Sequence, residues 1–248
     1  MPHTNHSYQT VIFDLDGTLI DSSPSILKCF GQALRDERLT PLLPLSDSLI
    51  GPPLRQTLIN LTGVTDSAVL DRLVDGFKAY YDTEGYKDTL LYDGVELLLA
   101  SLAELNIPLA IATNKRRIPT LKILEHLGWN GYFEKIGTLD TPVPPHTDKA
   151  ALIRYLLTEI GVPAEKSLYI GDKWEDGVAA DANGMRFHAA GWGYGEWESV
   201  IIPPGWQVVK TAHELAKLFS VYLKMRRLGH EVIVQELGEE LRVTLPLC

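Results

Sequence analysis

The chain contains 248 residues, 45% of them hydrophobic, and is therefore long enough to bury a substantial core. Its formal net charge of -9 and its pI near 5.3 argue against a nucleic-acid-binding protein, because such proteins engage phosphate backbones with clustered Lys and Arg. Its two cysteines, Cys29 and Cys248, can form neither a disulfide framework nor a cysteine-based zinc site.

The sequence shows no signal for export or for membrane insertion. The first ten residues, MPHTNHSYQT, lack the apolar stretch of a secretory signal, and no segment approaches the roughly 20 apolar residues that span a bilayer. We therefore expect a soluble, cytoplasmic protein with no membrane partner. The sequence leaves the oligomeric state, monomer or dimer, undetermined.

Short apolar runs alternate with longer segments of helical periodicity along most of the chain. The first run, residues 10–14, is rich in strand-forming side chains and ends in a polar segment with a turn-forming glycine. Such alternation is typical of a parallel sheet whose strands are joined by helical crossovers. We predict an α/β fold with a Rossmann-like parallel sheet, whose further strands are residues 107–113, 134–138, 167–171 and 185–189.

A long insertion separates the first strand from the second, and it exceeds what an ordinary crossover requires. Ser22 and Ser23 are placed to cap a helix at its start, with Pro24 in the first turn. A helical cap subdomain is the simplest interpretation of the insertion. Apolar residues recur at helical spacing in residues 24–38, 53–61 and 67–81.

The chain thus divides into a core domain, an inserted helical cap and a C-terminal extension. A helix is predicted at residues 215–227, across the start of the extension. It is followed by alternating β-branched residues around Gly238, which predict a β-hairpin. We predict that the core domain comprises residues 1–20 and 90–220. The cap comprises residues 21–89 and the extension residues 221–248.

Two carboxylates follow the first strand directly, in the segment Asp14-Leu15-Asp16-Gly17-Thr18. Strand ends in open α/β sheets face the ligand crevice, so the location favours chemistry over an ordinary Asp-Gly turn. One carboxylate can attack a phosphoryl group while the other protonates the leaving oxygen and then activates water. Gly17 permits a sharp turn, and the Thr18 hydroxyl can support the loop by hydrogen bonding.

Two further elements carry groups that suit phosphate oxygens. The segment Thr113-Asn114-Lys115 again follows an apolar strand, where a hydroxyl and backbone N–H groups can hold such oxygens. Lys149 begins a helical segment and can neutralise both a nucleophile and a transferring phosphoryl group. Neither element is specific by itself, because the first could be an ordinary loop and the second a solvated surface lysine.

The segment Gly171-Asp172-Lys173-Trp174-Glu175-Asp176-Gly177 adds acidic groups after another apolar strand. Carboxylate oxygens suit Mg²⁺, which can bridge to a substrate phosphate. We expect Asp172 to ligate the metal directly, whereas Asp176 either ligates it or caps the following helix. Because a parallel sheet brings the ends of its strands to one edge, we expect all four elements to converge there.

In their order these motifs resemble the haloacid dehalogenase superfamily, from DLDGT at residues 14–18 to GDKWED at residues 171–176. The helical insertion after the first motif is similar to the phosphoglycolate phosphatase-like branch. Further features of that branch are Asp21-Ser22, Tyr92-Asp93-Gly94 and the GWGYG segment at residues 191–195.

The resemblance implies a Mg²⁺-dependent phosphatase that hydrolyses a small phosphorylated metabolite, such as phosphoglycolate, through an aspartyl-phosphate intermediate. It makes Asp14 the nucleophile and a metal ligand, and Asp16 the acid/base and a ligand through its backbone carbonyl. Asp172 would be the remaining carboxylate ligand. The residues implied to hold the substrate phosphate are Thr113, Asn114 through its backbone, and Lys149.

The resemblance also places a substrate-specificity loop in the cap, at Gly51-Pro52-Pro53 with Arg55. Arg55 is suited to meet a substrate carboxylate bidentately, although a solvated position on a helix face is at least as compatible with the sequence.

Several other activities compete with phosphatase. A phosphosugar mutase would use the same aspartyl phosphate, and the core motifs do not separate the two. A dehalogenase would need neither Asp16 nor Asp172. A non-catalytic protein would have lost a motif residue, and none is lost. A phosphonate hydrolase would need a cap lysine to form an imine, for which the candidates are Lys28, Lys78 and Lys87.

Overall fold

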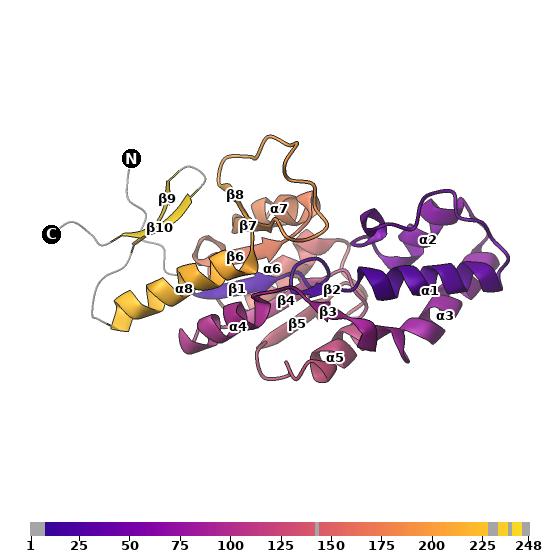
Figure 1. The fold of residues 1–248 in the computed structure, drawn as a ribbon, viewed down its shortest axis with the longest axis horizontal. Coiled ribbons are helices and arrows are strands. Elements are labelled where there is room, and N and C mark those ends of the chain that lie inside the picture. Colours follow the sequence, from indigo (N-terminus) through magenta and orange to yellow (C-terminus); the bar gives the residue numbers. More distant parts are fainter. Residues whose placement is uncertain (1–7, 142–143, 228–232, 238–239, 245–248) are drawn as a thin grey trace.

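A six-stranded, fully parallel sheet forms the centre of the fold (Figure 1). This computed structural model describes residues 8–141, 144–227, 233–237 and 240–244. The strand order is β5-β4-β1-β6-β7-β8, so β1 lies between β4 and β6 in the middle of the sheet. The strands are β1 (Thr10–Phe13), β4 (Leu109–Thr113), β5 (Lys135–Thr138), β6 (Ser167–Gly171), β7 (Arg186–Ala190) and β8 (Trp206–Val209).

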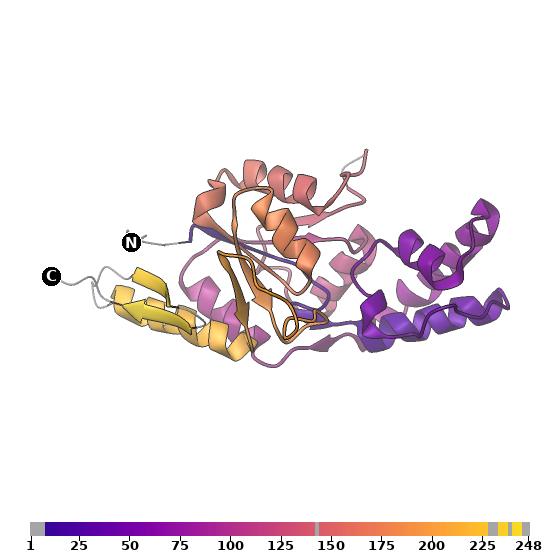
Figure 2. The ribbon, with the colours of Figure 1, turned by 90° about the horizontal axis from the view of Figure 1, so that it is seen from above.

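Helices cover both faces of this sheet and enclose two apolar cores (Figure 2). Successive side chains of a strand point to opposite faces. Val11 and Phe13 therefore pack with α4, α5 and α8, while Ile12 packs with α6 and α7. The helices are α4 (Val95–Glu104), α5 (Arg117–His126), α6 (Lys149–Ile160), α7 (Trp174–Asp181) and α8 (Ala212–Arg227), with a 3₁₀ turn η3 (Ala164–Lys166) before β6.

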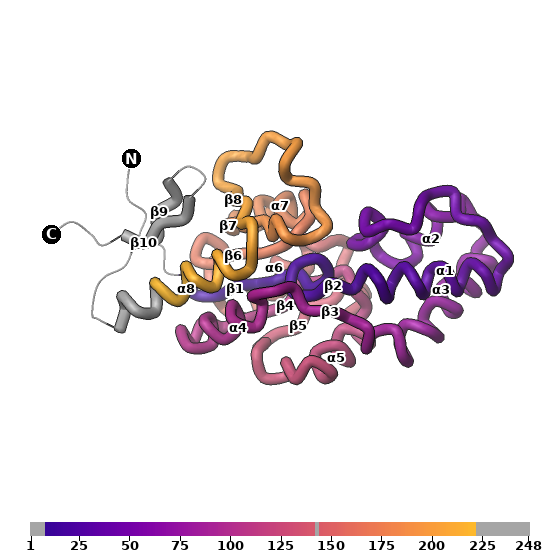
Figure 3. Tube along the Cα trace, in the orientation of Figure 1, coloured from indigo at the N-terminus to yellow at the C-terminus, as the bar shows by residue number. Residues whose placement is uncertain are grey.

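Three helices form a separate layer at one end of the sheet (Figure 1). They share a third apolar cluster, which includes Phe30, Leu58 and Phe77. The chain leaves the core at β2 and returns at β3, two short strands that pair antiparallel (Figure 3). This part contains β2 (Ile20–Asp21), α1 (Ser23–Asp36), η1 (Asp47–Leu49), α2 (Leu54–Thr62), α3 (Ser67–Tyr81), η2 (Gly85–Asp88) and β3 (Leu90–Leu91).

The α/β class is confirmed, and each of the five predicted strands is present within two residues of its predicted limits. The sequence missed β8, which is short and follows two prolines and a glycine, and it missed the two-residue strands β2 and β3. The predicted hairpin strands pair antiparallel as β9 (Ile233–Leu237) and β10 (Glu240–Thr244), while Gly238 lies outside the described residues. The division into core, cap and extension stays a prediction.

One capping prediction is wrong. Ser22 stands at the N-cap of α1, but its side chain makes no cap hydrogen bond. Its hydroxyl donates to Asp16 Oδ1, so the side chain supports the loop after β1 and not the start of the helix. Within the described residues, no helix combines the length and the apolar character that crossing a membrane requires.

His188 is an unpaired titratable group in the sheet. It is buried in β7, and neither ring nitrogen has a hydrogen-bond partner among the described residues. Burial, assisted by Arg186, lowers the pKa of His188 to about 3. The unfolded chain, in which a histidine titrates near pH ~6.5, then binds more protons between these two values. The free energy of unfolding must therefore fall as the pH drops through this range.

We expect His188→Leu to reduce this acid sensitivity. The wild-type protein should lose up to about 1.4 kcal/mol of unfolding free energy per pH unit relative to the variant between pH ~6.5 and ~5. Urea denaturation at several pH values, followed by circular dichroism, measures the difference. Parallel pH profiles for the two proteins would contradict this assignment.

Candidate active site

The carboxyl ends of the central strands bring the sequence motifs to one edge of the sheet. Asp14 follows β1, Thr113 ends β4, and Asp172 follows β6. These strands are neighbours in the sheet, so the three residues lie close in space although they are far apart in sequence. All three side chains are buried, at most 5% exposed.

Lys149 joins two of the clustered carboxylates. It is the first residue of α6, whose start is fixed by Asp148, the side chain of which accepts the N–H of Ala151 at 2.8 Å. Lys149 Nζ lies 3.1 Å from Asp14 Oδ2 and 2.5 Å from Asp176 Oδ1. Lys149 therefore lies beside Asp14, the candidate nucleophile, as predicted.

Asp176 caps the following helix, which is one of the two roles expected for it. It lies in the first turn of α7, and its Oδ2 accepts the backbone N–H of the N-cap residue Lys173 at 3.0 Å. Its Oδ1 accepts a hydrogen bond from Lys149. Direct metal ligation by Asp176 stays a prediction.

Two buried carboxylate oxygens nearby have no such partners. Asp14 Oδ1 and Asp172 Oδ1 make no hydrogen bond to any described residue. One oxygen from each of Asp14, Asp172 and Asp176 lies within 4.8 Å of the others, a separation that one cation can bridge. Hard carboxylate ligands suit Mg²⁺, so these residues fit the predicted metal.

The electrostatics of the cluster agree with that assignment. Burial raises the pKa of Asp14 to about 6, with Lys149 opposing the shift and Asp176 and Asp16 adding to it. Burial, together with Asp176 and Asp14, also raises the pKa of Asp172 well above its usual range. Burial would lower the pKa of Lys149, but Asp14 and Asp176 hold it well above its ordinary value. Lys149 alone therefore does not offset the burial of these carboxyl groups and their mutual repulsion.

The GWGYG segment closes over this cluster. The backbone N–H of Tyr194 donates to Asp172 Oδ2 at 2.8 Å, and Trp192 Nε1 donates to the Thr18 carbonyl at 2.9 Å. Gly17 has a φ of +83°, and a β-carbon there would collide with the Asp172 carboxylate. A β-carbon at Gly193 would collide with the Gly17 carbonyl and with Asp172, and one at Gly195 with the Asp172 carbonyl. These glycines let three backbone segments approach the cluster together.

The predicted support from the Thr18 side chain is wrong. Thr18 Oγ1 is buried and has no hydrogen-bond partner among the described residues. The residue ties the loop through its carbonyl, which Trp192 reaches, while Tyr194 Oη accepts the N–H groups of Ser22 and Ser23. The aromatic residues of the GWGYG segment therefore perform the supporting role.

Lys115 is a site residue that the sequence analysis did not identify. Its Nζ lies 2.8 Å from Asp16 Oδ1, and the side chains of Lys115 and Asp16 are only 6% and 11% exposed. The ammonium group also lies 4.7 Å from the ring centre of Tyr81, at the end of α3. Burial lowers the pKa of Lys115, but Asp16 and Tyr81 more than offset this and raise it. The sequence feature that could have identified Lys115 is its position directly after Thr113-Asn114.

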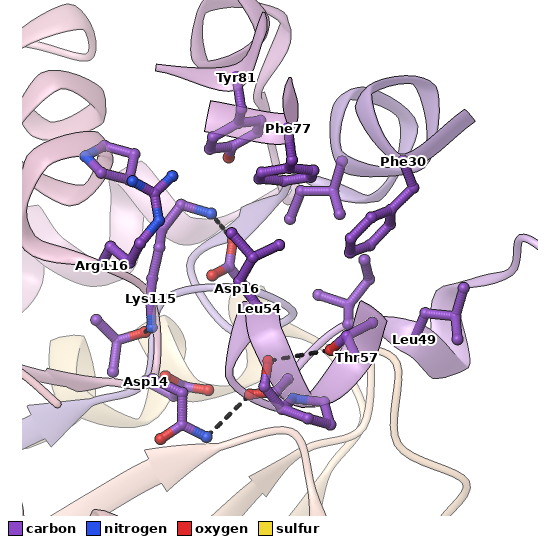
Figure 4. A pocket seen from close by; sticks show the side chains of 17 residues that line it. Asp14, Asp16, Phe30, Leu49, Leu54, Thr57, Phe77, Tyr81, Lys115 and Arg116 are labelled. Carbon is purple, nitrogen blue, oxygen red and sulfur yellow. Dashed lines mark hydrogen bonds and ion pairs between the residues drawn. The ribbon is translucent and has the colours of Figure 1, made fainter. Parts of the chain in front are cut away.

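A pocket lies above this edge, between the core and the three helices of the insertion (Figure 4). Asp14, Asp16, Thr113 and Asn114 line its core side. Asn114 Nδ2 donates to the Gly51 carbonyl at 2.9 Å, so the second motif is tied directly to the cap loop.

The residues of the predicted specificity loop do not all lie at the pocket. Gly51 and Pro52 line the pocket, as predicted for a specificity loop. Arg55 does not line it. Its guanidinium donates to Asp71 Oδ1 at 2.6 Å and to Ser67 Oγ at 3.1 Å on the exposed surface of the insertion. The expected contact of Arg55 with a substrate carboxylate is therefore not supported, and the solvated alternative is the better description.

The fold and this cluster are those of a Rossmann-like α/β protein with an acidic site at the ends of its strands, and the comparison with known families identifies its class. The model of the haloacid dehalogenase-like hydrolase family matches residues 11–190. The chain belongs to this family, and the resemblance inferred from its motifs, including the phosphoglycolate phosphatase-like branch, is confirmed.

Named relatives fall in more than one functional group. The tyrosine-protein kinase PtkA of Mycobacterium tuberculosis is 34% identical over 190 residues, which are 76% of this chain and 64% of PtkA, so the chain spans less than two thirds of that relative. The phosphoglycolate phosphatase of Xanthomonas campestris is 33% identical over 188 residues, covering 75% and 84% of the two chains. A predicted phosphatase from Clostridium acetobutylicum has a similar crystal structure, with a TM-score of 0.75, 28% identity and coverage of 85% and 97%.

We expect Mg²⁺ to stabilise the wild-type protein. A free Mg²⁺ concentration about 100 times the dissociation constant adds about 2.7 kcal/mol to the free energy of unfolding. This raises the melting temperature by roughly 5–10 °C for a chain of this size. Asp172→Asn should remove most of this shift because it deletes a free carboxylate oxygen. Differential scanning fluorimetry with and without Mg²⁺ measures it, and Asp75→Asn, on the exposed face of α3, is the matched control. An unchanged shift in Asp172→Asn would exclude this residue as a ligand.

Proposed function

We propose that this protein is a Mg²⁺-dependent phosphatase that hydrolyses a small phosphate monoester through an aspartyl-phosphate intermediate. The observation that carries the proposal is the Asp14 carboxylate at the floor of the pocket, with one oxygen bonded to Lys149 and the other without a partner. An unpartnered, buried carboxylate oxygen facing a pocket is suited to nucleophilic attack. The relatives of the chain include phosphatases, which supports the same reaction class.

In the first step an Asp14 oxygen forms a bond to phosphorus, and the bond between phosphorus and the leaving oxygen breaks. Asp16 gives its proton to that oxygen. In the second step Asp16 accepts a proton from water, whose oxygen attacks the phosphorus of the aspartyl phosphate. Inorganic phosphate then leaves and Asp14 is restored. Lys115 and Ser22 hold the Asp16 carboxylate in place at the pocket edge for both transfers.

The remaining groups balance the charge of the phosphoryl oxygens. Lys149 is the permanent cation at the nucleophile, and the Thr113 hydroxyl and the backbone after it are placed to donate hydrogen bonds. Thr113 Oγ1 accepts the N–H of Lys115 at 3.1 Å, which leaves its own proton free to donate. When bound by Asp14 and Asp172, Mg²⁺ would supply further positive charge against the phosphoryl group.

The placement of the cap lysines disfavours phosphonate hydrolysis. Imine formation needs a desolvated lysine in the pocket. Lys28, Lys78 and Lys87 have side chains that are 77%, 40% and 43% exposed, each paired with a nearby carboxylate. None of the three lines the pocket. A mutase differs only in the acceptor of the phosphoryl group, so product analysis separates it from a phosphatase.

We expect Asp14→Asn to lower the turnover number at least about 10³-fold, because an amide cannot form the acyl phosphate. Asp16→Asn should lower it by about 10²–10⁴-fold through loss of proton transfer. Phosphate release measures both, and circular dichroism checks that the variants fold. Full activity of pure Asp14→Asn protein would overturn the mechanism.

The direct test is phosphate release from a panel of phosphoglycolate, sugar phosphates, nucleoside monophosphates and a phosphonate, with Mg²⁺ and with a chelator. Phosphoglycolate is the first substrate to try because phosphatases named for it are among the relatives. We expect release from at least one monoester that chelation abolishes and Mg²⁺ restores. Activity that persists in the chelator would contradict the proposed metal dependence.

A further inference from the structure

The insertion side of the pocket is almost entirely apolar. Phe30, Phe77 and Leu54 line the insertion side of the pocket, and Asp14 and Asp16 line its core side (Figure 4). The insertion contributes only one hydroxyl side chain besides the Tyr81 phenol, that of Thr57, which lies 3.4 Å from the carbonyls of Pro52 and Pro53. The apolar side chains of this wall are Ile26, Phe30, Leu49, Ile50, Leu54 and Phe77.

Aromatic rings form a continuous row along this wall. The ring centres of Phe30 and Phe77 are 4.8 Å apart, and those of Phe77 and Tyr81 are 5.3 Å apart. The row ends at Lys115, whose ammonium group lies over Tyr81 and bonds to Asp16. A flat apolar leaving group, which departs from phosphorus and takes its proton from Asp16, would lie beside these rings.

The two cations that line the pocket, Lys115 and Arg116, already have carboxylate partners. Arg116 donates to both oxygens of Asp82, at 2.6 and 2.5 Å, and Lys115 is bonded to Asp16. Among the described residues, no lysine or arginine that lines the pocket lacks a carboxylate partner. A negatively charged leaving group would have to take a cation from one of these pairs.

We infer that the preferred substrate is a phosphate monoester with an uncharged, apolar leaving group, of the arylmethyl or longer alkyl class. This inference deepens the proposed phosphatase function and depends on it. A buried carboxylate without a partner is strongly disfavoured, whereas each buried methylene group favours binding by about fourfold. The same pocket that admits an apolar group therefore discriminates against phosphoglycolate.

The test compares benzyl phosphate, a series from methyl to pentyl phosphate, and phosphoglycolate, all of which release an alcohol. Aryl phosphates are left out because their better leaving groups would confuse chemistry with binding. We expect kcat/KM to rise about threefold to fourfold per methylene along the series. Benzyl phosphate should exceed phosphoglycolate at least tenfold. Equal or reversed values for benzyl phosphate and phosphoglycolate would overturn the inference.

Acetyl phosphate, a compact and activated phosphoryl donor, separates this inference from the proposed function. Mg²⁺-dependent hydrolysis of acetyl phosphate without a preference for benzyl phosphate would refute the apolar leaving group and leave the phosphatase standing. Absence of hydrolysis for acetyl phosphate and for every monoester would refute both.

A charged substitution in the apolar wall provides a second test of the inferred substrate preference. Leu54 and Ile59 are partly buried residues of the same helix and pack against the same apolar cluster, but only Leu54 lines the pocket. We expect Leu54→Arg to shift the ratio of kcat/KM for benzyl phosphate over phosphoglycolate at least tenfold toward phosphoglycolate. Ile59→Arg should change that ratio less than twofold. Equal shifts in the two variants, or none in either, would contradict the assigned wall.

Discussion

The bond between Lys149 and the paired carboxylates of Asp14 and Asp176 is the interaction on which the rest of the site depends. One ammonium group is shared between two buried acids, and a third acid, Asp172, lies beside them. Buried carboxylates are tolerated only when hydrogen bonds or cations compensate them. Under the proposed function, the same cluster would hold the divalent cation and provide the attacking oxygen of Asp14, which has no hydrogen-bond partner among the described residues.

The fold supplies this cluster through the geometry of parallel strands. Adjacent strands end at the same edge, so short motifs that are far apart in sequence meet there without long side chains. The backbone segments around the cluster can approach closely because Gly17, Gly193 and Gly195 stand where a β-carbon would have no room. In this way the GWGYG segment reaches Asp172 with a backbone N–H and leaves one oxygen of that residue free.

The sequence predicted the parts of the site that depend on strand ends, and it failed where side chains reach across the fold. Asp14, Thr113 and Asp172 could be placed because an apolar run precedes each of them. The sequence left Arg55 open between a substrate contact and a solvated helix face, because its partner Asp71 is not revealed by any local pattern. Lys115 was overlooked for the same reason, because its bond to Asp16 spans 99 residues. Long-range pairing of charges is the information that periodicity lacks.

Docking of the insertion and the chemistry of the pocket are linked through the same side chains. Asn114 bonds to Gly51, and Arg116 bonds to Asp82, so residues next to the second motif hold the insertion against the core. These bonds occupy the polar groups that would otherwise be free to recognise a charged substrate. The apolar wall then remains as the surface on which leaving groups can be distinguished. In the proposed enzyme, selectivity would therefore depend on how the insertion is held against the core, and the reaction on the residues at the strand ends beneath it.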